Sequence, residues 1–296
     1  MTAKPEMKND GALSDKEKEF YKRRDYNEWI DDSYLLMGKA QLHKHELDKA
    51  RVTFLHNIRE THDGEMRALS NIWLARTYTE MGNFSEANRL LGDMKPRTLS
   101  KAARAEYYLS LADMHIRQNR YERAIEPLTA AIDNIPLKKE RNRPAYILAR
   151  LYEETGNNLQ AGRYYKKVLK LNPPYEMEFN AKISRAGVFD VESGNVEEIR
   201  KELNKLLRDA KNREYRDQIF FAHANLSMRE GKQEEALEYY QMSAAASTTN
   251  NNQKGRAFLQ LAEHYFEISD YHLAQMYYDS TVTFLDKDYP GYEAYY

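Results

Sequence analysis

Apolar residues in this chain recur at helical spacing within short segments that end at turn residues. The segment 68–81 is one example, with apolar side chains at Leu69, Ile72, Trp73, Leu74 and Tyr78. This spacing predicts a helix that ends at Gly82, because glycine readily takes the left-handed conformation that closes a helix. A second helix is predicted from residue 84 onward, and the two are expected to pack side by side as a pair.

One alanine in each segment gives the pattern its period. It stands at positions 50, 87, 124, 161, 236 and 274, so the successive gaps are 37, 37, 37, 75 and 38 residues. The long gap is two periods, and Ile199 occupies the place of the missing alanine. A period of this length indicates a repeat protein in which each helix pair buries its apolar face against the next pair.

A fixed frame surrounds each of these positions. A small residue stands twelve positions upstream, and an aliphatic or aromatic residue stands four positions downstream. A turn residue stands five positions upstream, and these residues are His45, Gly82, Asn119, Gly156, Gly194, Gly231 and Ser269. We expect the small residues to let neighbouring helices approach closely, and the turn residues to join the two helices of a pair.

This frame resembles the tetratricopeptide repeat, whose pattern is a large residue, Leu, Gly or Ala, Tyr, Gly, Ala, a second large residue and Pro. The fourth repeat matches this pattern at Leu148, Ala149, Tyr152, Gly156, Ala161, Tyr165 and Pro173. The third repeat follows it at Tyr108, Leu111, Ala112, His115, Asn119, Ala124, Leu128 and Pro136. Repeats two, six and seven are good matches, and the first and fifth are degenerate because they carry His45 and Ile199. The resemblance implies an all-α fold, a right-handed superhelical solenoid of about seven helix-turn-helix repeats.

Three regions are expected along the chain. Residues 1–24 are polar and read as an N-terminal linker. The repeat array is predicted for 25–288, with repeats that begin near residues 31, 68, 105, 142, 180, 217 and 255. Residues 289–296 are expected to form a C-terminal tail that continues in the native protein.

Composition narrows the function classes. The formal net charge is -1, from 45 basic and 46 acidic side chains, so the basic excess of a nucleic-acid-binding protein is missing. Apolar runs are too short to cross a bilayer, so we expect no membrane insertion by this segment. The chain has no cysteine, which excludes disulfides and thiolate metal sites.

No catalytic arrangement emerges from the sequence. None of the eight histidines has the spacing of a metal motif, and no phosphate loop or serine elbow is present. His223 falls where the repeat expects leucine, so we interpret it as a packed residue. We therefore expect no catalytic residue, no metal, no cofactor and no enzyme activity.

The candidate binding surface is a groove lined by the first helix of each repeat. In the tetratricopeptide family the second, fifth, ninth, twelfth and thirteenth positions of that helix face a bound partner. Here these positions include Lys39, Arg76, Arg117, Arg143, Tyr146, Arg150, Phe221, Asn225 and Arg229. Their arginines are suited to binding acidic side chains or a terminal carboxylate. Glu106, Asp113 and Glu153 share the surface, and the alternative is a solvated face of mixed charge.

Several segments are similar to a more specific family, the PorW/SprE-type lipoproteins of the type IX secretion and gliding-motility apparatus. The segments are WIDDSYLLMGKA at 29–40, LNPPYEM at 171–177, NNNQK at 250–254 and YYDS at 277–280. The resemblance implies a periplasmic, outer-membrane-associated lipoprotein that connects parts of a secretion machine. It also implies an N-terminal lipid anchor upstream of this chain.

The sequence thus predicts a non-enzymatic scaffold that binds protein partners, with other type IX secretion or motility components as the expected ones. Two alternatives remain open at this point. One is a generic peptide-binding or chaperone-adaptor module, and the other is the regulatory domain of a larger enzyme.

Overall fold

The computed structural model describes residues 14–22, 29–189 and 196–295, and every regular element in these ranges is a helix. Residues 1–13 and 23–24 of the expected linker, and Gly194 of the fifth turn, lie outside the described residues. The chain divides into two compact units, unit 1 (Met1–Pro136) and unit 2 (Leu137–Tyr296).

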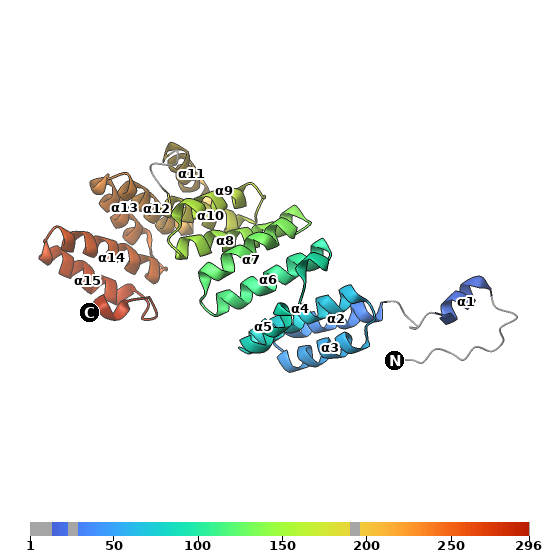
Figure 1. Cartoon of the computed structure of the whole chain (residues 1–296). Coiled ribbons are helices and arrows are strands. Elements are labelled where there is room, and N and C mark those ends of the chain that lie inside the picture. Colours follow the sequence, from blue (N-terminus) through green and yellow to red (C-terminus); the bar gives the residue numbers. More distant parts are fainter. Residues whose placement is uncertain (1–13, 23–28, 190–195, 296) are drawn as a thin grey trace. The chain divides into compact units, whose positions relative to one another are not determined.

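Unit 1 contains three helix pairs after a short N-terminal helix. Its α-helices are α1 (Asp15–Lys22), α2 (Ile30–His43), α3 (Leu47–Glu60), α4 (Gly64–Glu80), α5 (Phe84–Gly92), α6 (Lys101–Arg117) and α7 (Tyr121–Asn134). The 3₁₀ turn η2 (Pro96–Thr98) leads into α6. Figure 1 shows the helices of each pair running side by side in opposite directions.

Unit 2 contains four helix pairs. They are α8 (Asn142–Glu154) with α9 (Asn158–Leu169), α10 (Tyr175–Gly187) with α11 (Val196–Arg208), α12 (Arg216–Arg229) with α13 (Gln233–Ala246), and α14 (Asn251–Glu267) with α15 (Tyr271–Phe284). Three 3₁₀ segments accompany them, η3 (Lys138–Arg141), η4 (Ala210–Tyr215) and η5 (Tyr292–Tyr295). The described residues thus hold seven pairs, which confirms the all-α repeat fold.

The small residues of the frame lie where the helices of a pair touch. Each alanine of the repeat, and Ile199 in its place, is buried on the second helix of its pair. In the second pair, for example, Ala87 of α5 and Ala75 of α4 are both fully buried within one apolar cluster. Ile199 instead packs against Leu203 and Phe179, so the fifth pair fills the same place with a larger side chain.

The predicted turns are confirmed in every pair whose turn the structure describes. Gly82, Gly156 and Gly231 have φ between 74° and 76°, and the non-glycine residues at the same place also have positive φ. His45 has φ 58° and Ser269 has φ 63°. The residue that follows each turn residue donates its N–H back to a carbonyl of the preceding helix, which closes the helix end.

Across the described ranges, no helix combines the length and the apolar character that a bilayer crossing requires.

Candidate partner-binding surfaces

The first helices of the pairs form a face in each unit, which we call the first-helix face. Helices α2, α4 and α6 pack against one another in turn, as do α10, α12 and α14, whereas α8 is joined to α10 mainly through α9. In unit 1 it is formed by α2, α4 and α6, and in unit 2 by α8, α10, α12 and α14. All nine residues predicted for the groove lie on these helices. They therefore form two separate sets, one in each unit.

In unit 1 an indole ring brings two of the predicted residues together. The Lys39 Nζ lies 4.5 Å from the centroid of the Trp73 ring, and the Arg76 Cζ lies 4.4 Å from it. Arg76 also donates to the Glu106 carboxylate at 3.0 Å, from one first helix to the next. Burial and the neighbouring Arg76 lower the pKa of Lys39, which Glu106 partly offsets. We call Lys39, Trp73, Arg76 and Glu106 the Trp73 cluster.

Arg117, the third predicted residue of unit 1, is already paired within the unit. Its guanidinium contacts the carboxylates of Glu80 on α4 and Asp113 on its own helix. Two carboxylates therefore face this one cation, and little positive charge remains for a partner.

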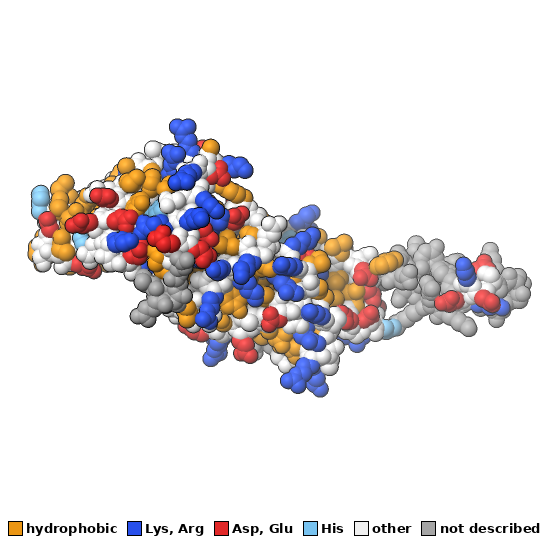
Figure 2. All heavy atoms as spheres, turned by 90° about the horizontal axis from the view of Figure 1, so that it is seen from above, with side chains coloured by type: hydrophobic (Ala, Val, Ile, Leu, Met, Phe, Trp, Pro, Cys, Tyr) orange, Lys and Arg blue, Asp and Glu red, His pale blue; other side chains and the backbone are white. Residues whose placement is uncertain are grey.

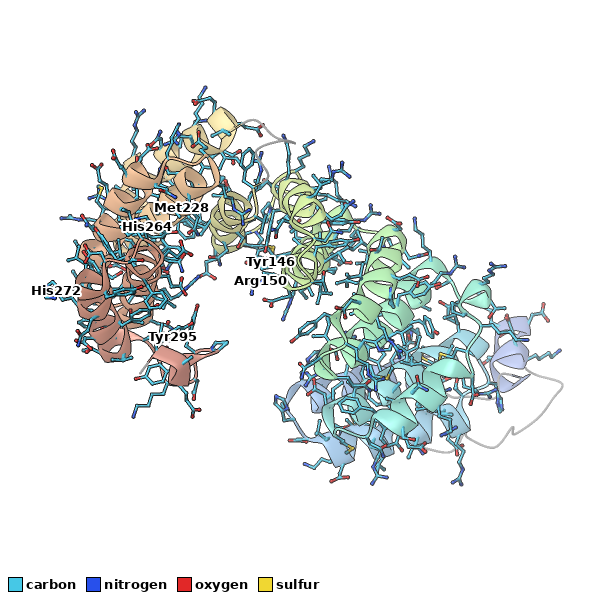
Figure 3. The ribbon with its side chains drawn as sticks, turned by 60° about the vertical axis from the view of Figure 1, so that its left-hand side comes forward. Tyr146, Arg150, Met228, His264, His272 and Tyr295 are labelled. Atoms are coloured by element: carbon cyan, nitrogen blue, oxygen red, sulfur yellow. The ribbon has the colours of Figure 1, made fainter. Side chains whose placement is uncertain are left out.

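In unit 2, Tyr146 and Arg150 extend from neighbouring turns of α8, and Figure 3 labels them side by side. The Tyr146 ring meets the buried Tyr165 ring edge to face, with 5.7 Å between centroids. The Tyr165 hydroxyl donates to Glu153 at 2.5 Å, and Arg150 pairs with Glu154 at 3.1 Å. Burial raises the pKa of both tyrosines, so both hydroxyls stay protonated and act as donors.

The same aromatic arrangement recurs on α12, 75 residues further along the chain. Phe221 meets the Tyr240 ring edge to face at 5.3 Å, and the Tyr240 hydroxyl donates to Asn225 Oδ1 at 2.7 Å. The Arg256 guanidinium of α14 lies 5.0 Å from the Phe221 centroid. Phe221 is largely buried and Asn225 accepts from Tyr240, so this site offers a partner mainly Arg256 and the edges of the rings.

Two predicted arginines are exposed and carry no ion pair within the described residues. Arg143 lies at the start of α8, and Arg229 lies at the end of α12. Arg229 also borders an open pocket beside the turn between α8 and α9, together with Phe189 and Asn158. Of the nine predicted residues, these two are the guanidiniums most available to a partner.

Sequence reasoning missed the residues that organise these groups. Trp73 was assigned to packing alone, although it stands three positions before Arg76 and so shares its side of α4. Tyr165 and Tyr240 stand four residues after a repeat alanine, where the frame requires only an aliphatic or aromatic residue, and only the structure shows that their hydroxyls reach polar groups of the first helices. Arg256 is not among the nine residues predicted for the groove, although it occupies the second position of the seventh repeat.

Charge is mixed over the surface as well as in the composition. Figure 2 shows basic, acidic and apolar side chains interspersed on the face in view. The residues that the structure describes hold no group of three or more histidine or carboxylate side chains able to bind a metal ion. His223 is fully buried and stacks on Tyr239, as expected for a packed residue.

Comparisons with known proteins agree with this geometry. A family model described as a tetratricopeptide repeat-like domain matches residues 1–144, and one described as a tetratricopeptide repeat matches residues 143–175. The chain is a helical-repeat protein by its fold. Over residues 1–175 its repeats match tetratricopeptide repeats, a class that generally acts in protein–protein interaction.

Solved structures share the fold at low sequence identity. The apo form of RapI has a TM-score of 0.60 and 13% identity, over 90% of this chain and 79% of that chain. The apo quorum sensor NprR from B. thuringiensis has a TM-score of 0.55 and 15% identity, over 89% and 78% of the two chains. A tetratricopeptide repeat protein from Parabacteroides merdae has a TM-score of 0.51 and 13% identity, over 90% and 96%. Among curated proteins nothing matches the chain.

Proposed function

We propose that this chain is a non-enzymatic scaffold whose first-helix faces bind protein partners. The observation that carries the proposal is the pair of first-helix faces, on which exposed cations and aromatic edges stand on a frame of buried alanines. A repeat array suits this task because each pair adds surface without changing the contacts that hold its neighbours.

The specific role that we propose is in the type IX secretion and gliding-motility machinery. The chain would be a periplasmic component, attached to the outer membrane by an upstream lipid anchor, that links other components of the machine. Support comes from the segments 29–40, 171–177, 250–254 and 277–280, which are similar to PorW/SprE-type lipoproteins.

Affinity capture from envelope extracts tests this role. The immobilised chain is expected to retain secretion or motility components that mass spectrometry identifies. Recovery of cytoplasmic chaperones in their place would favour the chaperone-adaptor alternative, and recovery of no envelope protein would contradict the proposal.

A charge-reversal variant tests whether the first-helix face of unit 2 is the binding surface. Arg143→Glu combined with Arg229→Glu changes two exposed arginines that have no ion pair within the described residues, so the fold should be retained. We expect at least a fivefold loss of captured partner, since like charges would then oppose an acidic segment. The matched control is Lys201→Glu with Lys205→Glu, which makes the same change of charge on the exposed side of the second helix α11. If both double variants lost the same amount of captured partner, the first-helix face of unit 2 would be excluded as the binding surface.

A further inference from the structure

Three of the segments that connect helix pairs lie side by side along one edge of unit 2. They lead into α8, α10 and α12 and cover residues 137–141, 170–176 and 208–216. Asn142, directly after the first segment, donates from Nδ2 to the Asn172 carbonyl of the second segment at 3.4 Å. Tyr175 of the second segment donates its hydroxyl to Asn212 Oδ1 of the third. We call these three segments the connection edge.

The connection edge has an excess of positive charge, although the formal net charge of the whole chain is only -1. It holds four carboxylates, at Glu140, Glu176, Asp209 and Glu214. One of them is used within the edge, because Asp209 accepts from the backbone N–H of Lys211. Eight cationic side chains oppose them, at Lys138, Lys139, Arg141, Lys170, Arg208, Lys211, Arg213 and Arg216. All of these cations except Arg141 are exposed and form no ion pair within the described residues, so their charge is available to a partner.

The opposite edge of unit 2, where the two helices of a pair join, does not share this excess. Its described turns with their flanking residues, 154–158, 229–234 and 267–271, hold five carboxylates and two cations. One of these cations, Lys232, already pairs with Glu230 at 2.9 Å. The cations of unit 2 are therefore gathered at the connection edge, and a solvated face of mixed charge would not need this separation.

Each segment of the connection edge also exposes one large side chain with apolar character. Leu137 is 53% exposed, and Tyr175 and Tyr215 are each 42% exposed. The Lys211 Nζ lies 6.0 Å from the centroid of the Tyr175 ring, so a cation and a ring stand together. Surfaces that lie against a lipid bilayer combine such groups, because rings and alkyl chains enter the headgroup region while lysines and arginines meet the phosphates.

We propose that the connection edge of unit 2 binds the surface of a membrane that contains anionic lipids. Its lysines and arginines contact the headgroup phosphates, and Leu137, Tyr175 and Tyr215 enter the headgroup region. The inference goes beyond the scaffold function, and the edge contains none of the nine residues predicted for the groove. A nucleic acid would meet the same cations, but it would leave Leu137 without a partner, because leucine has no ring on which a base could stack.

Co-sedimentation of the full chain with lipid vesicles tests the proposal. One set of vesicles contains equal parts of phosphatidylglycerol and phosphatidylcholine, and the other set contains phosphatidylcholine alone. We expect binding to the anionic vesicles to be more than about tenfold tighter, and to weaken with added salt, which screens the cations from the headgroups. Inorganic phosphate should compete no better than chloride at equal ionic strength, because the edge binds a lipid surface and not a free phosphate ion.

A pair of double variants separates the connection edge from general charge. Lys138→Gln combined with Arg213→Gln should weaken binding to the anionic vesicles about twentyfold, since each cation near the surface contributes about fivefold. The matched control is Arg163→Gln with Lys201→Gln, which removes the same charge from exposed positions midway along α9 and α11. This control should retain most of the affinity. Circular dichroism verifies that both variants keep their helical content.

A single apolar variant separates a membrane from a partner that binds by charge alone. Leu137→Ser should weaken binding to the anionic vesicles about fivefold, because about half of a leucine side chain would no longer enter the headgroup region. The loss should persist at high salt, since it does not depend on charge. Leu159→Ser is the matched control, because Leu159 is 40% exposed beside the turn between α8 and α9 on the opposite edge.

Any one of four results would overturn the inference. They are equal binding to the two kinds of vesicle, equal losses in the two double variants, equal affinities of Leu137→Ser and Leu159→Ser, and tighter binding of a double-stranded DNA oligonucleotide than of anionic vesicles at the same salt concentration. The last result would assign the edge to nucleic acid. None of the four depends on the secretion role, because the vesicles contain only lipid, and a capture experiment that recovers no secretion component would leave the vesicle result standing.

Discussion

The two units use one repeat frame but fill one of its positions differently. Four residues after the repeat alanine, unit 1 has only apolar side chains, at Phe54, Leu91 and Leu128. Unit 2 has tyrosine there in three of its four pairs, at Tyr165, Tyr240 and Tyr278. A position on the second helix can therefore also contribute to the first-helix face. Tyr165 and Tyr240 fill the core with their rings and donate their hydroxyls to polar groups of the first helices, whereas Tyr278 is only partly buried.

The units also differ in which atoms a side chain would meet at their most closely packed glycines. Substitution of these glycines is expected to give the largest change in the free energy of unfolding. A Cβ atom at Gly255 would lie 2.6 Å from the backbone nitrogen of Leu285, and one at Gly38 would lie 2.5 Å from the buried Phe54 ring. Backbone moves less readily than a side chain. We therefore expect Gly255→Ala to lower the free energy of unfolding by about 3 kcal/mol, and Gly38→Ala by about 2 kcal/mol.

Denaturant unfolding followed by two signals measures these losses separately. Both tryptophans, Trp29 and Trp73, lie in unit 1, so their fluorescence reports that unit, whereas circular dichroism reports both. Gly92→Ala is the control, because a Cβ at this end of α5 meets no atom within 4 Å. Losses of similar size in all three variants would show that close approach is not what these glycines provide.

The next largest expected difference between the units is in how their stability depends on pH. His223 in unit 2 is fully buried, and both of its ring nitrogens lack partners in the described chain. Burial and the nearby Arg200, opposed by Glu235, lower its pKa from 6.5 to about 4. The His223 imidazole is therefore protonated near pH 6.5 in the unfolded chain, but stays neutral at that pH in the folded chain. The free energy of unfolding of unit 2 therefore has its full value above pH 6.5 and decreases by up to about 3 kcal/mol as the pH falls toward 4.

Replacing this histidine removes the acid sensitivity. His223→Leu introduces the leucine that the repeat expects at this place, and should flatten the pH dependence of the free energy of unfolding between pH 6.5 and 4. His272→Gln is the control, since His272 is exposed on α15 (Figure 3). An unchanged pH dependence in His223→Leu would assign the acid sensitivity to other groups. His115 of unit 1 is the first to test, because burial lowers its pKa too.

The tyrosine hydroxyls themselves give a smaller effect. Tyr165→Phe removes the hydroxyl that donates to the Glu153 carboxylate, which keeps only its ion pair with Arg150, and should cost about 1.5 kcal/mol because that acceptor is charged. Tyr240→Phe removes a neutral hydrogen bond to Asn225 and should cost about 1 kcal/mol. Leu128→Phe in unit 1 controls for a ring at the same position of the frame. If both tyrosine variants unfold like the unchanged protein, the hydroxyls are dispensable and the contrast between the units is one of shape alone.

The sequence was sufficient for features that each pair repeats within itself. The buried alanines, the pairing of helices and the left-handed turns follow from local spacing, and the turn at His45 was predicted although it is not glycine. The sequence did not show which cations of the groove form ion pairs, because partners of Arg76 and Arg117 lie on other helices. Glu106 and Glu80 stand 30 and 37 residues from the arginines they pair with, so only packing decides which cation stays unpaired.

The smallest expected effect concerns the turns of the first and last pairs, where a non-glycine residue adopts positive φ, as Asn119 also does in the third pair. His45 and Ser269 are exposed and pay the steric cost of the left-handed conformation, so His45→Gly and Ser269→Gly should each raise the free energy of unfolding by about 0.5–1 kcal/mol. The gain should be the smaller one at Ser269, because its hydroxyl contacts Tyr271 at 3.5 Å. The reverse change, Gly156→Ala, should lose about 1 kcal/mol, since its φ is 75° and no atom would touch the new methyl group. Thermal unfolding resolves these steps. If glycine at position 45 were neutral or destabilising, the local balance that closes the first pair would differ from that at the glycine turns Gly82, Gly156 and Gly231.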